Sequence, residues 1–325
     1  MSLLHVENLQ VDITNVNGSF TAVQEFSVKI EKGEIHGILG ESGSGKSLVV
    51  KAILGILPRN VKVSADHIML DGINLLNLAP ARRREVVCNK MSIIFQDATD
   101  ALDPCFTIGY QLFETLRVHE KVDRAKRKLL AKELLYSVGF GEPEPILKLY
   151  PHQLSLLMKQ RASIAITLAS RPKILVADEP TAGLDPASQA QINELLLRLN
   201  IENEMAIILI SHDFSVLNLR SDTLSVMYCG QIMETGHSYD LLSHPRHPYT
   251  RALLDSAPSF GQNVKKRGRL FSLKGLIPSL QYLPVGCPLG PRCPRADRQC
   301  VNKPHLVKSD KQPARCHIPI EYEGN

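Results

Sequence analysis

The chain has 325 residues, of which 44% are hydrophobic and 22% charged, a balance typical of a globular protein with a sizeable core. A disordered chain is excluded, because it would need fewer apolar residues and more uncompensated charge. The length allows two domains, or one large domain with an appendage.

The sequence carries no sign of membrane insertion or export. No stretch approaches the roughly 18 consecutive apolar residues of a membrane helix. The first residues, MSLLHVENLQ, form neither a basic leader nor an apolar signal core. We therefore expect a cytosolic protein. Its seven cysteines should stay reduced there, so a cluster of them favours metal binding over disulfides.

The formal net charge of +5 is concentrated near the C-terminus. Between Gly261 and Ile318 there are twelve Lys or Arg and two Asp. The rest of the chain is therefore acidic, which argues against a uniformly basic nucleic-acid-binding protein. The basic tail fits a solvated surface or a contact with anionic lipid beside a membrane partner. It lacks the interleaved aromatic residues of a surface that stacks on bases.

The N-terminal part predicts strands followed by a glycine-rich loop and a helix. Short apolar runs separated by turns predict strands over residues 3–13, 26–30 and 34–40. A helix is predicted over residues 47–57, ending before Pro58, because proline cannot continue a helix.

The middle of the chain predicts a helical lobe and then an α/β arrangement. Apolar residues recur at helical spacing between Ile108 and Val138. The runs KILVADEP (173–180) and MAIILISHD (205–213) are typical of fully buried parallel strands. Between them, Asp185 is placed as N-cap and Pro186 at the first position of a helix. The order strand, helix, strand predicts an α/β sheet whose ligand lies at the carboxyl ends of the strands.

A phosphate-binding loop is predicted at GESGSGKS, which matches G-x-x-x-x-G-K-[ST] between a predicted strand and a predicted helix. In such a loop backbone N–H groups surround the β-phosphate of ATP, the lysine reaches the β- and γ-phosphates, and the serine hydroxyl binds Mg²⁺. The predicted nucleotide-binding residues are Gly40, Glu41, Ser42, Gly43, Ser44, Gly45, Lys46 and Ser47.

Polar residues at the ends of the buried strands complete a hydrolytic site. Asp178 is predicted to hold the Mg²⁺ shell, and Glu179 to orient and activate the attacking water. Gln96, after a short apolar strand, is predicted to contact Mg²⁺ and this water. His212, at the end of the next strand, is predicted to contact the γ-phosphate.

The segments GESGSGKS, FQD, ADEP, LD and SHD, in this order, resemble the ATP-binding-cassette family over about residues 3–257. The resemblance implies a P-loop NTPase core of the α/β class with a helical subdomain over about residues 97–170. It also implies a head-to-tail dimer in which each ATP lies between one chain's phosphate loop and the other chain's signature sequence. By the same resemblance, Phe20 stacks on adenine, Gln96 is the Q-loop glutamine, Asp185 is the D-loop aspartate and His212 is the switch histidine.

The family signature LSGGQ is replaced by LSLLM at residues 154–158. Ser155 is kept, but Leu156 and Leu157 stand where glycines let backbone N–H groups approach the γ-phosphate of the partner's ATP. Loss of such contacts costs orders of magnitude in rate, because they stabilise charge in the transition state. The site that this signature caps is therefore predicted to be weak or silent. The intact catalytic residues predict an asymmetric heterodimer with a distinct second ATPase subunit.

Four cysteines near the C-terminus have the spacing C-x5-C-x6-C-x15-C: Cys287, Cys293, Cys300 and Cys316. The absence of tight C-x2-C pairs makes zinc less natural than an iron–sulfur cluster. A four-iron cluster with four thiolates is negatively charged, so Arg292, Arg295, Arg298 and Arg315 are expected to balance it. The remaining cysteines, Cys88, Cys105 and Cys229, are interpreted as buried or incidental.

The tail carries a second resemblance. HPRHPYTRALLDSAP, IPSL, GCPLGPRCPRADRQC and KPHL resemble the C-terminal extension of oligopeptide and dipeptide transporter ATPases, many of which hold a [4Fe-4S] cluster there. The resemblance places the extension at residues 258–325. It implies a peripheral ATPase subunit on the cytoplasmic face of a bacterial inner membrane, within the group linked to antimicrobial-peptide resistance. Its implied partners are two membrane permease subunits and, indirectly, a periplasmic substrate-binding protein.

Two other functions are weighed against transport. A cassette ATPase that acts on nucleic acid or ribosomes usually has a second cassette or a long coiled-coil insertion, and this sequence shows neither. A regulatory subunit of another membrane system would bind ATP but hydrolyse it poorly. ATP turnover measured in the heterodimer would distinguish it from a transporter ATPase.

Overall fold

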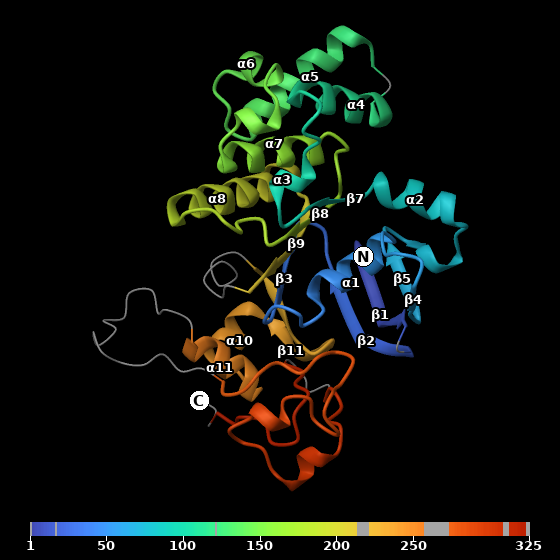
Figure 1. The fold of residues 1–325 in the computed structure, drawn as a ribbon, viewed down its shortest axis with the longest axis vertical. Helices are drawn as coiled ribbons and strands as arrows, with labels where there is room; N and C mark the ends of the chain where they lie inside the picture. The colour runs from blue at the N-terminus through green and yellow to red at the C-terminus, as the bar shows by residue number, and fades with distance from the viewer. Residues whose placement is uncertain are drawn as a thin grey trace. The chain divides into compact units, whose positions relative to one another are not determined.

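The computed structural model describes residues 2–16, 18–120, 122–212, 221–256, 273–307 and 312–322 (Figure 1). The chain divides into two compact units, residues Met1–Asn77 with Leu209–Asn325, and residues Leu78–Ile208. The boundary falls within strand β9, Ala206–Ser211. Both units combine strands and helices, so the predicted α/β class is confirmed.

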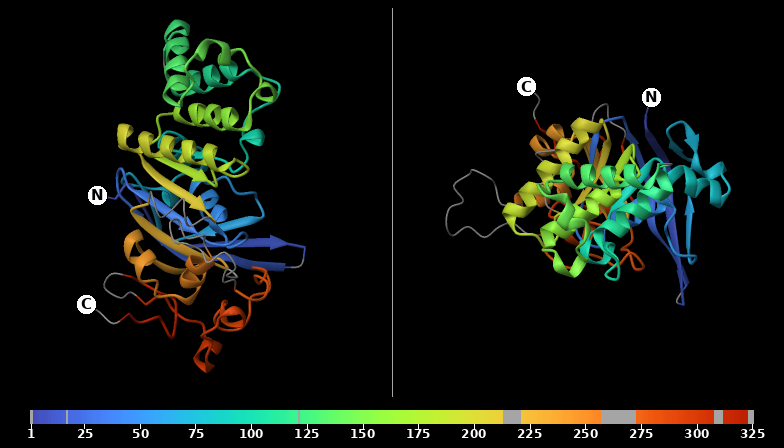
Figure 2. Two further views of the ribbon diagram at one scale, coloured as in Figure 1. Left: turned by 90° about the vertical axis from the view of Figure 1, so that its left-hand side faces the viewer. Right: turned by 90° about the horizontal axis from the view of Figure 1, so that it is seen from above.

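The first unit contains an antiparallel sheet with the order β2-β1-β5-β6, and β4 pairs with β1. The long strands β1 and β2 lie side by side (Figure 2). Along β1 the apolar residues Leu4, Val6, Leu9 and Val11 are fully buried, whereas the side chains between them are more exposed. Leu4 with Val6 and Leu9 with Val11 each follow a period of two, with a register shift between Val6 and Leu9, so one face of the strand lies in the core. The strands are β1 Leu4–Asn15, β2 Gly18–Ile30, β4 Val61–Ser64, β5 His67–Leu70 and β6 Ile73–Asn74.

The first unit also contains strands in the order β11-β10-β3, followed by the end of β9. Strands β10 and β3 are parallel, and all five residues of β3 are buried, as expected for a parallel strand covered on both faces. The elements are β3 Ile35–Leu39, β10 Thr223–Tyr228, β11 Gln231–His237, α1 Lys46–Leu54, η1 Leu75–Asn77, α10 Ser238–Ser243 and α11 Pro248–Ser256.

Helix α1 ends earlier than the sequence predicted. We expected it to run until Pro58, but its last residue is Leu54. Gly55 follows in the left-handed conformation, with φ of 74°, and donates its N–H to Ala52 O. A left-handed glycine closes the last turn of a helix, so the helix stops before proline can interrupt it.

The second unit contains the parallel strands β7 and β8, the start of β9 and a group of helices. The predicted helix after Pro186 is confirmed, since the Asp185 carboxylate accepts hydrogen bonds from the N–H groups of Ala187 and Ser188 at 3.0 Å. Helix α7 packs against α4 and α5 (Figure 1). The elements are α2 Pro80–Cys88, β7 Met91–Ile94, α3 Ala98–Ala101, α4 Ile108–His119, α5 Arg124–Ser137, α6 Pro143–Leu147, η2 Pro151–Gln153, α7 Leu156–Leu168, β8 Ile174–Asp178 and α8 Pro186–Asn203.

The described part of the C-terminal extension has little regular structure beyond η3 Gly290–Arg292 and η4 Arg298–Val301, and its expected start at residue 258 lies outside the described residues. It is tied to strand β11 by Glu234, which is fully buried. The Glu234 carboxylate accepts hydrogen bonds from the Arg246 and His247 N–H groups and from the Gln312 amide at 2.6 Å. A buried carboxylate is stable only with such partners, so the extension completes the core of the first unit.

None of the helices in the described residues has both the length and the hydropathy that are needed to cross a lipid bilayer.

Candidate functional site

The predicted phosphate loop connects β3 to α1, as the motif requires. Gly40 follows the last residue of β3, where a Cβ atom would lie 2.2 Å from the carbonyl oxygen of Met227. Because no real Cβ tolerates such a distance, the close approach of β10 to the loop requires glycine at this position. The loop is also held by the N–H of Gly230, which donates to Ser44 O at 2.8 Å.

Lys46 points back over the loop. Its ammonium group donates hydrogen bonds to the carbonyl oxygens of Gly40 at 2.8 Å and Glu41 at 3.1 Å, and its side chain is buried. The Ser44 hydroxyl is also buried, and it has no hydrogen-bond partner among the described residues. A buried cation and a buried hydroxyl at the N-terminus of a helix form a site suited to a polyphosphate.

In the second unit, Gln96 and Glu179 lie within hydrogen-bonding distance of each other. Gln96 follows β7 and Glu179 follows β8, two parallel neighbouring strands. The Gln96 amide donates a hydrogen bond to a Glu179 carboxylate oxygen at 3.0 Å. This bond fixes the orientation of the carboxylate. Asp178, one residue earlier, is buried at the end of β8, where carboxylate oxygen suits Mg²⁺.

The other residues predicted to contact the nucleotide, Phe20, His212 and Asp185, are half-buried or exposed. Phe20 is half-buried on β2 opposite Ile13, so it is not a core residue. His212 is exposed directly after β9. Asp185 caps α8, and the hydrogen bonds that it accepts from the Ser188 hydroxyl and the neighbouring N–H groups lower the pKa of its carboxyl group.

The altered signature LSLLM forms the start of helix α7. Ser155 is its N-cap, and the Ser155 hydroxyl accepts from the Met158 N–H at 3.3 Å. Leu156 and Leu157 are the first two helical residues, whose N–H groups have no acceptor within a helix. Leu156 is 38% exposed. A Cβ atom added at Gly183 would lie 3.5 Å from Leu156 Cδ2. The partial positive charge of a helix N-terminus is thus kept, but bulky side chains surround it.

The four cysteines of the extension line one cavity in the first unit, together with side chains such as His247, His317 and Arg295. A zinc ion with Zn–S bonds of about 2.3 Å would bring four sulfurs to ~3.8 Å of one another. In the described residues, however, no three of these cysteines have Sγ atoms that all lie within 4.8 Å of each other. The sulfurs are therefore spaced more widely than the ligands of a single zinc ion.

Burial opposes the ionisation of three of the four thiols that line this cavity. Burial raises the pKa values of Cys287 and Cys293 and brings that of Cys316 to about 11. Opposing this, backbone N–H groups bind the sulfurs, as in the bond from Arg295 N–H to Cys293 Sγ at 3.4 Å. Hydrogen bonds of this kind favour the thiolate form, which is the form that binds metal.

Backbone geometry brings two of the cysteines together. The N–H of Cys287 donates to the carbonyl oxygen of Cys300 at 2.8 Å. Gly286, with φ of 83°, precedes it, and a Cβ there would lie 2.3 Å from the same oxygen. Of the other cysteines, Cys88 and Cys105 are exposed and Cys229 is buried.

The sequence did not predict three residues that surround the phosphate loop. Arg292 and Tyr249 contact Glu41, the second residue of the loop, and Tyr228 contacts Arg292. Arg292 was expected to balance the charge of a cluster, and Arg315 likewise. Instead their guanidinium groups pair with Glu41 and Glu25, and of the four arginines only Arg295 lines the cysteine cavity. No local pattern could reveal these pairs, because their partners lie far away in the sequence.

Comparison with known proteins identifies the family of this chain. The model of the ABC transporter family matches residues 23–182, and the model of the oligopeptide/dipeptide transporter C-terminal region matches residues 233–300. The chain is 42% identical to the peptide transport system ATP-binding protein SapD of Salmonella typhimurium, over 99% of both chains. The chain belongs to the ABC transporter ATPase family.

Another relative and two solved structures are also similar to this ABC ATPase. It is 41% identical to the dipeptide transport ATP-binding protein DppD of Escherichia coli K12, over 100% of this chain and 99% of DppD. The ATP-binding cassette MJ0796, solved as a dimer with ADP and Pi, has a TM-score of 0.65 at 24% identity and covers 72% of this chain and 98% of its own. CbiO1 of Clostridium perfringens, part of an ABC transporter complex, has a TM-score of 0.64 at 28% identity and covers 75% of this chain and 91% of its own. The predicted ABC fold is therefore confirmed.

Proposed function

We propose that this ABC ATPase is an ATP-hydrolysing subunit of a peptide transporter of the SapD or DppD type. The observation that carries the proposal is the similarity to both proteins over the full length, including the C-terminal region. Residues 1–257 form the nucleotide-binding domain in this proposal, and residues 258–325 form the transporter-type extension. The subunit acts at the cytoplasmic face of a bacterial inner membrane, on which it is peripheral.

The proposed reaction is attack of water on the γ-phosphate of ATP. The loop from Gly40 to Ser47 binds the phosphates, with Lys46 as the cationic contact. Ser47 and Asp178 hold Mg²⁺, which neutralises phosphate charge when it is bound. Glu179 accepts the proton of the attacking water while Gln96 keeps its carboxylate oriented. His212 contacts the γ-phosphate, Phe20 stacks on adenine, and Asp185 acts at the dimer junction.

The altered signature supports an asymmetric heterodimer. The catalytic residues of this chain are those of an intact site, whereas Leu156 and Leu157 obstruct the helix N-terminus that would cap the partner's ATP. A homodimer would contain two sites capped by LSLLM. The partner in this proposal is a second ABC ATPase of the SapF type, which supplies the intact signature. The ATP site that is completed by LSLLM of this chain is the one that hydrolyses ATP poorly or not at all.

Exposed aromatic residues support a contact with two membrane permease subunits. In the second unit, Phe106 and Tyr110 are 42% and 48% exposed, and their rings stack with centroids 4.4 Å apart. Exposed aromatic pairs are common anchors of protein interfaces. They lie in the segment from Phe95 to Leu116, through which ATP-driven motion would pass to the permeases. A periplasmic substrate-binding protein is an indirect partner, and the substrate class is peptides, including antimicrobial ones.

The transport function is tested by purification of the tagged chain from membranes. We expect two permeases and a second ATPase to purify with it, and we expect replacement of Phe106 and Tyr110 by Ala to release the permeases. The control is Tyr136→Ala, which changes an exposed tyrosine on α5. Recovery with ribosomes or DNA alone would contradict the transport function. Recovery with permeases but without ATP turnover would identify a regulatory ATP-binding subunit instead.

We also propose that Cys287, Cys293, Cys300 and Cys316 hold a [4Fe-4S] cluster. The donor set fits: four thiols line one cavity, backbone N–H groups face the sulfurs, and the spacing is too wide for one zinc ion. When bound, the group supplies a compact centre that cross-links the extension. The chain's own contribution is the cavity, the sulfur hydrogen bonds and the basic Arg295 at its edge.

Metal analysis of anaerobically purified protein tests the cluster. We expect a brown protein with about four irons and four acid-labile sulfides per chain. Replacing Cys300 by Ser should remove most of the iron and lower the melting temperature, because one of the four ligands is lost. Cys105→Ser is the matched control, since Cys105 is exposed and lies outside the cavity. A colourless protein loaded with zinc would refute the cluster.

A further inference from the structure

Glu41, the second residue of the phosphate loop, is held by the C-terminal extension. Arg292 forms a two-pronged ion pair with its carboxylate, with Nη1 to Oε2 at 2.8 Å and Nη2 to Oε1 at 3.1 Å. The Arg292 side chain is 6% exposed and the Glu41 side chain 28%, so the pair is partly shielded from solvent. A bidentate guanidinium–carboxylate pair in such surroundings is strong and fixed in direction.

Arg292 is itself held in place from several sides. Its Nη1 donates to the Tyr228 hydroxyl at 3.2 Å and its Nε to the Lys274 carbonyl oxygen at 3.4 Å. The guanidinium carbon lies 5.7 Å from the centre of the Tyr228 ring, within the range of a cation–π contact. The hydrogen bonds to Glu41 keep the pKa of Arg292 above its usual range, so its charge is permanent.

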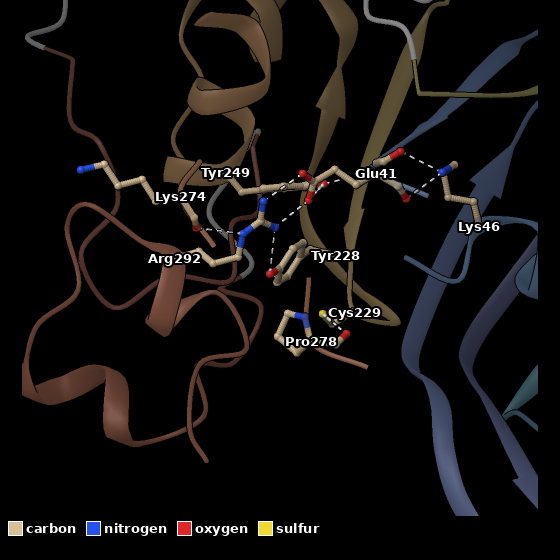
Figure 3. Close-up of polar contacts among 9 residues, drawn as sticks. Glu41, Lys46, Tyr228, Cys229, Tyr249, Lys274, Pro278 and Arg292 are labelled. Atoms are coloured by element: carbon tan, nitrogen blue, oxygen red, sulfur yellow. Dashed lines mark hydrogen bonds and ion pairs between the residues drawn. The ribbon is translucent and has the colours of Figure 1, made fainter. Parts of the chain in front are cut away.

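The remaining polar atoms of Glu41 are bound within the first unit as well. Its backbone N–H donates to the hydroxyl of the buried Tyr249 at 3.0 Å, and its carbonyl oxygen accepts from Lys46. Figure 3 shows the Glu41 side chain directed towards Arg292, on the side opposite Lys46. Burial raises the pKa of Tyr228 to about 12, so its hydroxyl stays neutral beside this pair.

These contacts matter because a carboxylate in a phosphate loop repels the ligand. Adenosine triphosphate carries several negative charges, and its phosphates bind within a few residues of Glu41. A carboxylate without a counter-charge at this distance would oppose binding, and in partly buried surroundings the opposition amounts to about tenfold in affinity. Arg292 neutralises the charge and keeps the carboxylate turned away from the phosphate side of the loop.

We propose that Arg292 is a positioning residue for ATP, supplied to the phosphate loop by the C-terminal extension. It acts through Glu41 and does not touch the nucleotide itself. The inference rests on ATP binding at GESGSGKS, which is part of the proposed function. Failure of the wild-type chain to bind MgATP would contradict the proposed function. Normal binding by the wild type with no change in Arg292→Ala would contradict only the role of Arg292.

The experiment measures the Kd of MgATP for the full chain by calorimetry, in the wild type and three variants. Arg292→Ala is expected to raise Kd about tenfold, because Glu41 is left charged and unneutralised. Glu41→Gln alone is expected to lower Kd about threefold, because the positive charge of Arg292 is then no longer neutralised and attracts the phosphates. In the double variant Glu41→Gln with Arg292→Ala, Kd should return to within about threefold of the wild type.

The opposite effects of the two single substitutions separate this role from a merely structural one. If the pair served only to stabilise the fold, loss of either partner would weaken binding equally, and Glu41→Gln would not rescue Arg292→Ala. That result, or a Kd of Arg292→Ala within twofold of the wild type, would overturn the proposal. If Arg292→Ala does not fold, Glu41→Gln decides alone, since an unchanged or raised Kd there would overturn the proposal.

Kinetics and a matched control complete the test. Because the pair acts equally on bound ATP and on the transition state, Arg292→Ala should raise KM for ATP and leave kcat unchanged. Arg82→Ala removes an exposed Arg–Glu pair with a similar distance, 2.7 Å between Nη1 of Arg82 and Oε2 of Glu85. Its Kd and KM should match the wild type. A fall in kcat without a change in KM for Arg292→Ala would contradict a role in positioning ATP.

Discussion

Replacing Glu179 by Gln is expected to lower the ATP turnover of the assembled complex by about 100- to 1000-fold while ATP still binds. The amide cannot accept the proton of the attacking water. Its carbonyl oxygen can still accept the hydrogen bond from Gln96, which the carboxylate accepts at 3.0 Å. The geometry is therefore preserved and only the base is lost. Steady-state phosphate release, with MgATP affinity measured beside it, gives the result.

The control for this substitution is Glu133→Gln, which changes an exposed glutamate on helix α5 in the same way. Its turnover should equal that of the wild type. Loss of ATP binding in Glu179→Gln would show that the side chain holds the nucleotide and does not act as the base. Turnover within threefold of the wild type would contradict the catalytic assignment.

Restoring LSGGQ by the triple change Leu156→Gly, Leu157→Gly and Met158→Gln is expected to raise the turnover of this chain without its partner by about 10- to 100-fold. Alone, the chain can form only sites that are capped by its own signature. Glycine at the first two positions of α7 removes the side chains that surround the free N–H groups and lets them approach a phosphate. The measurement is phosphate release as a function of chain concentration.

Two controls separate this effect from loosening of the helical lobe. Adding Glu179→Gln to the triple variant should abolish the gain, since hydrolysis would still need the base. Leu129→Gly, which changes an exposed leucine on helix α5, should not raise turnover. If the unaltered chain already hydrolyses ATP by itself as fast as the assembled complex does, the asymmetric model is wrong.

Features encoded by neighbouring residues were predictable from the sequence. The phosphate loop lies between β3 and α1 because a buried apolar strand, a glycine-rich turn and a helical pattern follow one another directly. Helix α8 begins at Pro186 because aspartate caps a helix and proline fits its first position. Gln96 and Glu179 were each predicted to act on the attacking water, but their hydrogen bond was not predicted, because the sequence does not show that β7 and β8 are neighbours.

Features that depend on distant pairs were not predictable. Arg292 and Glu41 are separated by 251 residues, and nothing in the composition of either segment specifies the other. The same holds for Arg315, which is fully buried and pairs with Glu25. A basic tail indicates only that positive charge is present. Tertiary packing decides which arginine meets a carboxylate and which faces the cysteine cavity.

The ion pair between Arg292 and Glu41 has a consequence for how the chain is made. Glu41 is synthesised first, and Arg292 is added to the chain 251 residues later. At about 5–20 residues per second, this leaves an interval of roughly 10–50 s. During this time the nascent cassette already carries its phosphate loop, but Glu41 still lacks its counter-charge from the extension. Late arrival of Arg292 thus makes ATP affinity one of the last properties that the growing polypeptide acquires.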